Sequence, residues 1–137
     1  LTDILSSKAI YYFNTHLDHI GEAARTESSQ MIVNEIGKYS NEYPVILSGD
    51  FNYRSISDGY KIIASKIFDT KLISKTESTG GNITFNGFGK DIQPDNKIDF
   101  IFVNDKVEVL DHNVDTTTFN GLYPSDHYPV ISEISIK

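Results

Sequence analysis

The stretch PVILSGDFN, residues 44–52, combines a short apolar strand with a polar tip. Pro44 starts the strand and residues 45–47 form its apolar part. Asp50 and Asn52 follow, two residues apart. Because side chains alternate along an extended backbone, this spacing aims a carboxylate and an amide at one spot. The stretch therefore predicts either a turn or one corner of an active site.

The rest of the chain shows two helical patterns and five more strand patterns. Strands are predicted where apolar residues alternate or run together, at residues 9–17, 83–88, 97–103, 107–114 and 127–136. Helices are predicted at 22–39, on an apolar face that includes Met31, and at 58–67, with Ser57 or Asp58 as the N-cap. The order β-α-β-α-β-β-β-β predicts an α/β (α+β) fold, with one mixed sheet of about six strands and two helices on its outer face.

One face of this predicted sheet has no cover. Two helices cannot shield both faces of a six-stranded sheet, and an apolar sheet face has to pack against another layer. The face without helices therefore packs on a second sheet, or part of the fold is absent from this chain.

The composition describes an ordinary globular domain. The chain has 137 residues, 39% hydrophobic and 12% aromatic, which suffices for one domain with a core. No apolar run approaches the roughly 20 residues of a transmembrane helix, and no targeting segment is visible, so we expect a soluble protein of unknown compartment. The first residue is Leu1, which suggests a processed or truncated chain. The absence of cysteine excludes thiolate chemistry, and the net charge of −7 disfavours a broad nucleic-acid-binding face.

Four strand ends carry polar residues of the kinds that serve in catalysis. They are residues 14–19 (NTHLDH), 49–52 (GDFN), 98–101 (IDFI) and 125–129 (SDHYP). Three of the four histidines, His16, His19 and His127, lie in these stretches. A single Asp after a strand is usually a turn former or a helix cap, and we interpret Asp18 and Asp58 in this way. Together, the four stretches predict one convergent site at one edge of the sheet.

Asp99 is the acidic residue that is hardest to explain structurally. It lies inside a strong strand pattern, where a carboxylate is costly unless a donor or a cation pairs with it. His127 is a natural partner, because a neighbouring carboxylate fixes the imidazole tautomer and stabilises its charged form. Oxygen-rich side chains without sulfur favour Mg²⁺, Mn²⁺ or Ca²⁺. These residue types predict metal-assisted phosphoryl hydrolysis.

The motifs NTHLDH, GDFN, IDFIF and SDHYPV, in this order, resemble those of the endonuclease/exonuclease/phosphatase family. This family contains deoxyribonuclease I-like and exonuclease III-like Mg²⁺-dependent phosphoesterases. The matching motifs extend from His16 to Pro129. The resemblance implies half of a four-layer α-β-β-α sandwich. It also implies hydrolysis of a phosphodiester or phosphomonoester by attack of activated water at phosphorus.

The resemblance also implies catalytic roles for five residues. His16 would contact the scissile phosphate. Asp50 would orient or deprotonate the attacking water, and Asn52 would help to hold the phosphate and the nucleophile. Asp99 would pair with His127, which would stabilise charge on the phosphoryl oxygens or take part in proton transfer.

Substrate and metal contacts follow from the same resemblance. Asn14, His16 and Asn52 would bind the substrate. Asp126 and Asp50 would hold the metal, with Mg²⁺ as the expected cofactor and Mn²⁺ or Ca²⁺ as possible replacements. The substrate would be a phosphate ester of a nucleic acid, a phospholipid head group, or a sugar or inositol phosphate.

The resemblance covers only the C-terminal half of the family's catalytic domain, which we assign to residues 1–137. The N-terminal half of the family domain supplies the Glu that is the principal metal ligand, and no segment before Ala9 could provide it. We therefore expect the missing half in the same parent chain or in another chain. The isolated 137 residues should bind metal poorly and be weak or inactive catalysts.

Two other interpretations remain at the level of sequence. The metallo-β-lactamase pattern H-x-H-x-D-H would align its end with Asp18 and His19, as in a Zn²⁺ hydrolase. It would then place Asn14 where a zinc-binding His is needed, and it leaves the GDFN and SDHYPV motifs unused. The second interpretation is a catalytically inactive sandwich module that acts in binding.

Overall fold

The structure is a computed structural model, and it describes residues 1–4, 7–90 and 92–137. The strands within these residues are β1 (Tyr11–His16), β2 (Val45–Asp50), β3 (Phe68–Asp69), β4 (Asp99–Val103), β5 (Val107–Val114) and β6 (Val130–Ile136). The helices are α1 (Glu22–Ile36), α2 (Asp58–Ala64), α3 (Thr70–Ile73) and a 3₁₀ turn, η1 (Gly87–Gly89). In this part of the chain, every helix is too short or too polar to cross a membrane.

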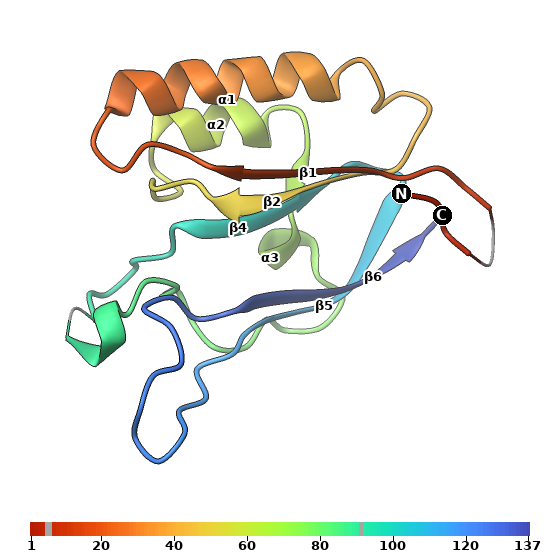
Figure 1. Cartoon of the computed structure of the whole chain (residues 1–137). Helices are drawn as coiled ribbons and strands as arrows, with labels where there is room; N and C mark the ends of the chain where they lie inside the picture. Colours follow the sequence, from red (N-terminus) through yellow and green to blue (C-terminus); the bar gives the residue numbers. More distant parts are fainter. Residues whose placement is uncertain (5–6, 91) are drawn as a thin grey trace.

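The elements form three layers (Figure 1). The central layer is a four-stranded mixed sheet in the order β1-β2-β4-β3, in which β1 and β2 are parallel and the other pairs are antiparallel. Helices α1 and α2 lie on one face of this sheet, and the β5-β6 hairpin lies on the other side. The predicted α/β fold, with a mixed sheet and two helices on its outer face, is confirmed.

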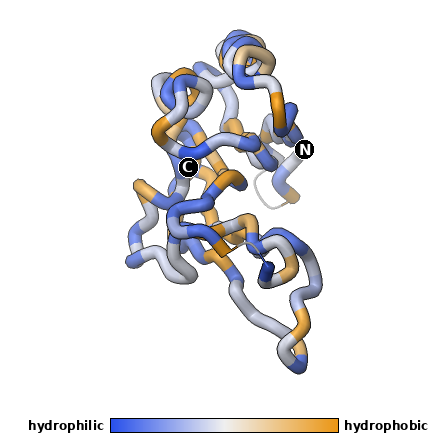
Figure 2. The backbone as a smooth tube through the Cα atoms, turned by 90° about the vertical axis from the view of Figure 1, so that its left-hand side faces the viewer, coloured by the Kyte–Doolittle hydropathy of each residue, from blue (hydrophilic) through white to orange (hydrophobic). Residues whose placement is uncertain are grey.

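The grouping of the strands differs from the prediction of one sheet of about six. Strands β5 and β6 form a separate two-stranded sheet, which lies beneath the four-stranded sheet (Figure 1). Figure 2, turned by 90°, views the two helices nearly end-on at the top, with the rest of the chain beneath them. Val103, at the end of β4, forms a buried cluster with Val107 and Val109 of β5. The hairpin folds back because its apolar face gains a partner there, since a two-stranded ribbon alone is barely stable in water. It covers part of the sheet face for which the sequence offered no helix.

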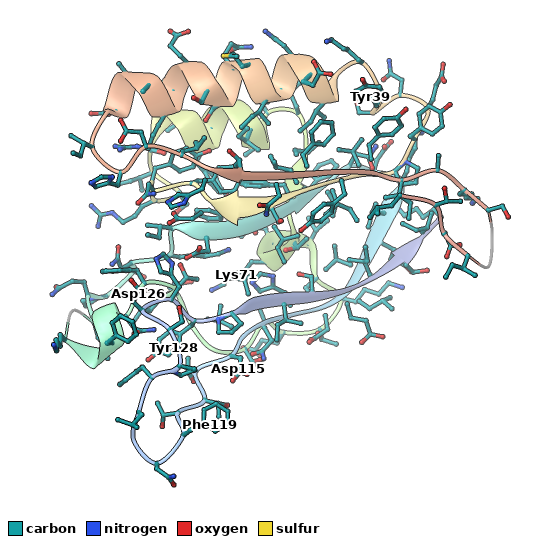
Figure 3. All side chains as sticks on the ribbon, in the orientation of Figure 1. Tyr39, Lys71, Asp115, Phe119, Asp126 and Tyr128 are labelled. Atoms are coloured by element: carbon teal, nitrogen blue, oxygen red, sulfur yellow. The ribbon has the colours of Figure 1, made fainter. Side chains whose placement is uncertain are left out.

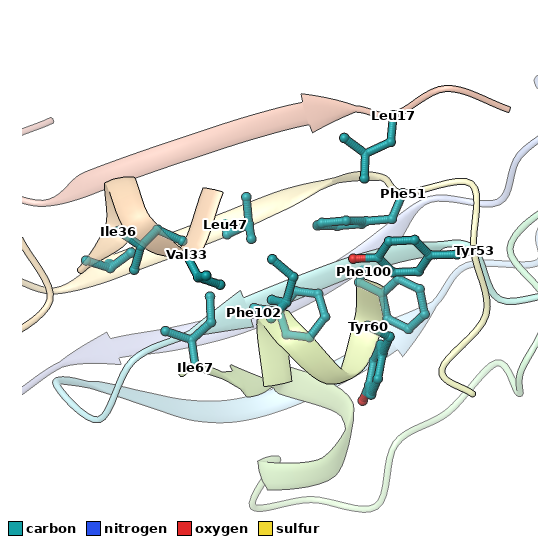
Figure 4. Close-up of a cluster of buried hydrophobic side chains, with 12 residues drawn as sticks. Leu17, Val33, Ile36, Leu47, Phe51, Tyr53, Tyr60, Ile67, Phe100 and Phe102 are labelled. Atoms are coloured by element: carbon teal, nitrogen blue, oxygen red, sulfur yellow. The ribbon is translucent and has the colours of Figure 1, made fainter. Parts of the chain in front are cut away.

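The main core lies between the two helices and the four-stranded sheet (Figure 4). Its centre is aromatic: Phe51 packs edge-on against Phe100 and Phe102, with ring centroids 5.9 and 5.5 Å apart. Helix α1 buries Val33 and Ile36 in this core, whereas Met31, which we predicted on the buried face, is 71% exposed. Two apolar stripes at 3–4 spacing fit this helix, and contacts with the sheet select between them.

Two predicted strands differ from the structure in their extent. The predicted strand 83–88 is reduced to a single bridge between Phe85 and His127, followed by η1. The three residues of η1 have φ values of 57°, 57° and 78°, and this left-handed backbone ends an extended run. The last strand begins at Val130 instead of His127, because residues 126–128 pair with residues 84–86 and not with β5.

Lys97 and Asp69 form a buried ion pair that we did not predict from the sequence. Lys97 Nζ lies 3.3 Å from both carboxylate oxygens of Asp69, and both residues are buried. The hydroxyl of Tyr60 donates to the same carboxylate at 3.1 Å, and the ammonium group lies 4.5 Å above the ring of Phe100. Burial lowers the pKa of Lys97, although Asp69 acts in the opposite direction. This pair joins β3 to the segment that leads into β4.

His112 is a second buried titratable group, and it joins three elements. Its Nδ1 lies 2.9 Å from the hydroxyl of Thr70 in α3 and 3.1 Å from the hydroxyl of Ser132 in β6. Thr70 in turn donates to the carbonyl of Ile101 in β4. His112 Nε2 is buried with no hydrogen-bond partner among the described residues. Burial lowers the pKa of His112 to about 4, and the charge of Lys97 acts in the same direction.

Because the pKa of His112 is lowered in the folded chain, we expect the chain to lose stability in weak acid. The unfolded-state pKa of 6.5 exceeds the folded-state pKa of about 4, so His112 contributes stability that is complete above pH 6.5 and is lost as the pH falls toward 4. The full contribution is about 3 kcal/mol. Urea denaturation of the wild type and of His112→Gln between pH 7.5 and 4 measures it. The variant should show a flatter pH dependence of the unfolding free energy, and equal slopes would contradict the assignment.

Candidate active site

A cleft of about 500 Å³ lies at the edge of the sheet where β1 and β2 end and β4 begins. Its lining includes five of the seven predicted site residues, Asn14, His16, Asp50, Asp99 and His127. These come from all four polar stretches of the sequence. The cleft lining does not include Asn52 or Asp126.

Strand pairing explains why distant residues meet here. Strand β1 runs parallel to β2, with His16 beside Asp50 at their ends. Strand β4 runs antiparallel to β2, so Asp99 at its start lies directly opposite Asp50. Alternation along β1 puts Tyr12, Asn14 and His16 on the face that lines the cleft, as predicted.

Gly49 permits the close approach of β1 and β2 at this edge. Its φ is 153°, and a Cβ atom built on it would overlap the backbone carbonyl of Thr15 on β1. Beyond this point the Leu17 amide donates to the Asp50 carbonyl at 2.9 Å, which extends the contact between the two chain segments past the strands. The glycine in the GDFN motif therefore sets the distance between His16 and Asp50.

The centre of the cleft holds two carboxylates and an imidazole. Directly opposed like charges destabilise an antiparallel pair, so Asp50 and Asp99 need a positive partner. His127 provides it: its Nδ1 donates to Asp99 Oδ2 at 2.8 Å, and its Nε2 lies 3.9 Å from Asp50 Oδ2. The predicted pairing of Asp99 with His127 is present in the structure.

The protonation of these groups follows from their surroundings. Burial raises the pKa of Asp50, and the neighbouring charge of Asp99 acts in the same direction against the hydrogen bond from the Asn52 amide. Burial opposes a charge on His127, but the hydrogen bond to Asp99 and the charges of the nearby carboxylates outweigh it and raise the pKa of His127. The site thus favours an imidazolium beside a carboxylate that attracts protons more strongly than usual.

Two β1 residues form the outer wall of the cleft. The side chain of His16 is 75% exposed, with Nε2 3.4 Å from Asp50 Oδ2. Asn14 donates from its amide to the hydroxyl of Ser48 at 2.9 Å, and the hydroxyl of Tyr12 lies 2.6 Å from the same oxygen. His16 is therefore free to meet a ligand from solvent, whereas Asn14 is held against β2.

Asn52 does not point where simple alternation predicts. Its φ is 52°, so the extended backbone ends at Asp50 and the next side chains turn away. Its backbone amide donates to Asp50 Oδ1 at 2.8 Å, and its side-chain amide donates to the Leu17 carbonyl at 2.9 Å. Asn52 faces a neighbouring recess that Arg25 and Arg54 also line. In this structure it braces the tip of β2, and substrate binding by Asn52 remains a prediction.

Asp126 and the first-motif residues Asp18 and His19 lie outside the central group. Figure 3 shows Asp126 and Tyr128 at the cleft end of the molecule. The Asp126 carboxylate accepts from Ser125 Oγ at 3.4 Å, and its role as a metal ligand remains a prediction. Asp18 accepts backbone hydrogen bonds from Ile20 and Gly21, each at 3.0 Å, so it forms the predicted turn.

Thr84 and Asn86 are two further fully buried residues near the site. The side-chain oxygen of Thr84 accepts hydrogen bonds from the backbone amides of Ile98 and Asp99, at 2.9 and 3.0 Å. Asn86 donates from its side chain to the Ser125 carbonyl at 3.3 Å. A Thr and an Asn at alternate positions of a short apolar stretch were the available signal, but only the fold shows what they contact.

One group of side chains in the cleft could hold a divalent metal ion. The ligand atoms of Asp50, Asp99 and His127 lie within 4.8 Å of one another. Carboxylate oxygens are the hard ligands that Mg²⁺ and Ca²⁺ prefer. Because Asp99 and His127 are bonded to each other, the group offers fewer free oxygens than the six that such a cation takes. The residues fit part of a coordination shell that needs further oxygen ligands.

Comparison with known proteins supports the family resemblance that the sequence motifs indicate. A sequence profile described as the Endonuclease/Exonuclease/phosphatase family matches residues 4–127. No curated protein matches the chain. Among solved structures, the endonuclease/exonuclease/phosphatase from Bacteroides vulgatus is 31% identical, with a TM-score of 0.87 over 99% of this chain and 53% of that one. A family protein from Bacteroides thetaiotaomicron is 28% identical, with a TM-score of 0.88 over 99% and 53%.

A third similar structure has a more specific description. The mannosyl-6-phosphatase Bt3783 of Bacteroides thetaiotaomicron VPI-5482 is 29% identical, with a TM-score of 0.82 over 96% of this chain and 53% of that one. The chain thus spans about half the length of each of these structures, which agrees with half of a four-layer sandwich. With the motifs, the fold and the profile match in agreement, the chain belongs to the endonuclease/exonuclease/phosphatase family.

Proposed function

We propose that this chain forms part of a metal-dependent phosphoesterase that hydrolyses a phosphate ester by attack of water at phosphorus. The observation that carries the proposal is the meeting of Asp50, Asp99 and His127 in one cleft, with the His127–Asp99 hydrogen bond at 2.8 Å. Family membership supports the same reaction class. It favours this reaction over the zinc hydrolase interpretation, in which Asp18 and His19 would be metal ligands.

Asp50 and His127 divide the proton chemistry between them. Asp50 orients the attacking water and accepts its proton, and the raised pKa of this carboxylate makes it a better base than an ordinary Asp. Asp99 holds His127 with its Nε2 directed to the Asp50 side of the cleft, 3.9 Å from Asp50 Oδ2. The raised pKa of His127 favours an imidazolium, which stabilises negative charge on the phosphoryl oxygens.

The substrate phosphate is held by residues on the open side of the cleft. His16 reaches it from β1, since its side chain is 75% exposed and lies at the cleft rim. Asn14 lies two residues earlier on the same face and contributes an amide. Asn52 takes part if its side chain leaves the Leu17 carbonyl, to which it donates at 2.9 Å.

Asp50 and Asp126 are the proposed ligands of a hard divalent cation, with Mg²⁺ as the expected ion and Mn²⁺ or Ca²⁺ as alternatives. A bound divalent cation neutralises charge on phosphoryl oxygens and lowers the pKa of a coordinated water. Asp99 and His127 keep their mutual hydrogen bond in this arrangement, so we assign the ion to Asp50, whose carboxylate takes no part in that bond.

The remaining oxygen ligands come from a second half of the fold. The central group alone does not complete a coordination shell, and the chain spans about half of each similar structure. We place the other half in the same parent protein or in a partner chain. Residues 1–137 alone should then bind Mg²⁺ weakly and turn over slowly.

The substrate is a phosphate ester, and a sugar phosphate is the first class to test. One similar structure is described as a mannosyl-6-phosphatase. The net charge of −7 also favours a small substrate over an extended nucleic acid, because the chain lacks the excess of cationic side chains that phosphate backbones require. Nucleic acids and phospholipid head groups remain in the test panel.

The experiment compares the complete encoded protein with residues 1–137 alone. Both are assayed with p-nitrophenyl phosphate, bis-p-nitrophenyl phosphate, mannose 6-phosphate and a DNA duplex, each with Mg²⁺, Mn²⁺, Ca²⁺, Zn²⁺ or EDTA. We expect the complete protein to hydrolyse at least one ester with Mg²⁺, and EDTA to abolish that activity. We expect the 137-residue chain to be at least about 100-fold slower, since it lacks part of the metal shell.

Three outcomes would contradict parts of this proposal. Activity with Zn²⁺ alone would argue for a different hydrolase. Full Mg²⁺-dependent turnover by the 137-residue chain would remove the need for a second half. A complete protein that binds phosphate esters but hydrolyses none would indicate an inactive binding module.

A further inference from the structure

We propose that Thr84 is a positioning residue that holds the Asp99–His127 pair in register; its catalytic consequence rests on the proposed function, but its structural consequence does not. Its side-chain oxygen accepts hydrogen bonds from the backbone amides of Ile98 at 2.9 Å and Asp99 at 3.0 Å. Its backbone carbonyl accepts from the amide of Tyr128 at 2.7 Å. Thr84 is therefore hydrogen-bonded both to the backbone at Asp99 and to the backbone next to His127.

The residues that follow Thr84 reinforce the His127 side of this bridge. Phe85 packs edge-on against the imidazole, with ring centroids 5.1 Å apart and an angle of 70° between the planes. The backbone amide of Asn86 donates to the Asp126 carbonyl at 2.7 Å. Residues 84–86 thus hold the backbone of residues 126–128. Of their three side chains, that of Thr84 is the one that contacts the Asp99 backbone.

The hydroxyl of Thr84 is the acceptor for two backbone amides at the start of β4. Asp99 is the first residue of β4, and its side chain has to turn toward His127 at the point where the strand begins. A hydroxyl oxygen has two lone pairs, which match the two amides of Ile98 and Asp99. Thr84 is fully buried, and its hydrogen bonds to these two amides are partly buried. Removing the hydroxyl leaves two partly buried donors without their acceptor, beside the residue that orients the imidazole.

This arrangement makes Thr84 different from a residue that only stabilises the fold. Thr70 is also fully buried, and its hydroxyl also contacts β4, where it donates to the Ile101 carbonyl at 3.0 Å. Its contacts, however, lead to His112 and Ser132 in the hairpin layer and not to Asp99 or His127. Thr70→Val is therefore a matched control for the loss of a buried threonine hydroxyl.

The test follows the His127 Nδ1 proton by NMR in the 137-residue chain, with kcat and KM measured in the complete protein. In the wild type we expect a hydrogen-bonded Nδ1 proton signal. Thr84→Val should lose that signal and lower kcat at least tenfold, with KM changed less than twofold. Thr84→Ser keeps the acceptor and should restore both. Thr70→Val should lower the unfolding midpoint while it keeps the signal and kcat.

A second substitution covers the case in which Thr84→Val does not fold, and three results would overturn the proposal. If Thr84→Val does not fold, Thr84→Ala replaces it, because a water molecule can enter the space of the hydroxyl and pair the two amides loosely. The signal should then weaken in a folded protein. A wild type without the signal, a Thr84→Val with the wild-type signal, or equal loss of the signal in Thr70→Val would each overturn the proposal. Absence of turnover in every protein would instead contradict the proposed function and leave the NMR result to decide on Thr84.

Discussion

Replacing His127 by Ala is expected to lower kcat of the complete protein by about 10²–10⁴-fold, the range that a positioned acid–base group contributes. The imidazole is the positive partner of two carboxylates that face each other across β2 and β4. Its loss leaves the like charges of Asp50 and Asp99 without a positive partner. It also removes the imidazolium that would stabilise charge on the phosphoryl oxygens. Initial rates with the preferred ester at saturating Mg²⁺ measure the effect.

His19→Ala is the matched control for this substitution. The side chain of His19 is 76% exposed, and its Nδ1 lies 3.8 Å from Asp18 Oδ1, outside the central group of the site, so its removal should leave kcat within twofold of the wild type. Thermal unfolding should show that His127→Ala still folds, since His127 lies in the segment between β5 and β6 and not in either hydrophobic cluster. A loss of activity below tenfold would refute the catalytic role of His127.

Three residues of the site, His16, Asp50 and Asp99, were predictable because they lie on regular strands. The ends of an apolar strand are visible in the sequence, and its side chains alternate. His16, Asp50 and Asp99 could therefore be placed at one sheet edge from the sequence alone. The partner of Asp99 followed from the cost of a carboxylate inside a strand. For these residues, the local strand pattern and the tertiary structure require the same side-chain position.

The features that escaped prediction depend on backbone geometry or on tertiary contacts. Asn52 leaves the site cleft because of its positive φ, which no pattern of apolar residues reports. The role of Thr84 depends on two amides that lie 14 and 15 residues away in the chain. The separate β5-β6 sheet reflects packing of Val107 and Val109 beneath β4. Periodicity identifies a strand but not the layer to which it belongs.

Gly49→Ala is expected to cost about 2–5 kcal/mol of unfolding free energy, because overpacking against Thr15 and strain of the alanine backbone each add roughly 1–3 kcal/mol. The new Cβ would overlap the backbone of Thr15, and backbone atoms of a paired strand cannot move aside as a flexible side chain can. Strands β1 and β2 would have to separate where they end. His16 would then move away from Asp50, from which its Nε2 now lies 3.4 Å, so activity should fall even at temperatures where the variant remains folded.

Gly121→Ala separates this steric effect from the strain of an unusual backbone. Gly121 also has a positive φ, 77°, but a Cβ there would meet no atom within 4 Å. Its substitution should cost only the about 1–2 kcal/mol of a left-handed alanine. Urea denaturation of both variants gives the comparison, and equal losses would show that β1 and β2 can relax around the added methyl group. A larger loss at Gly49 would instead mean that the glycine of the GDFN motif is required by strand contact, which is the contact that brings His16 to Asp50.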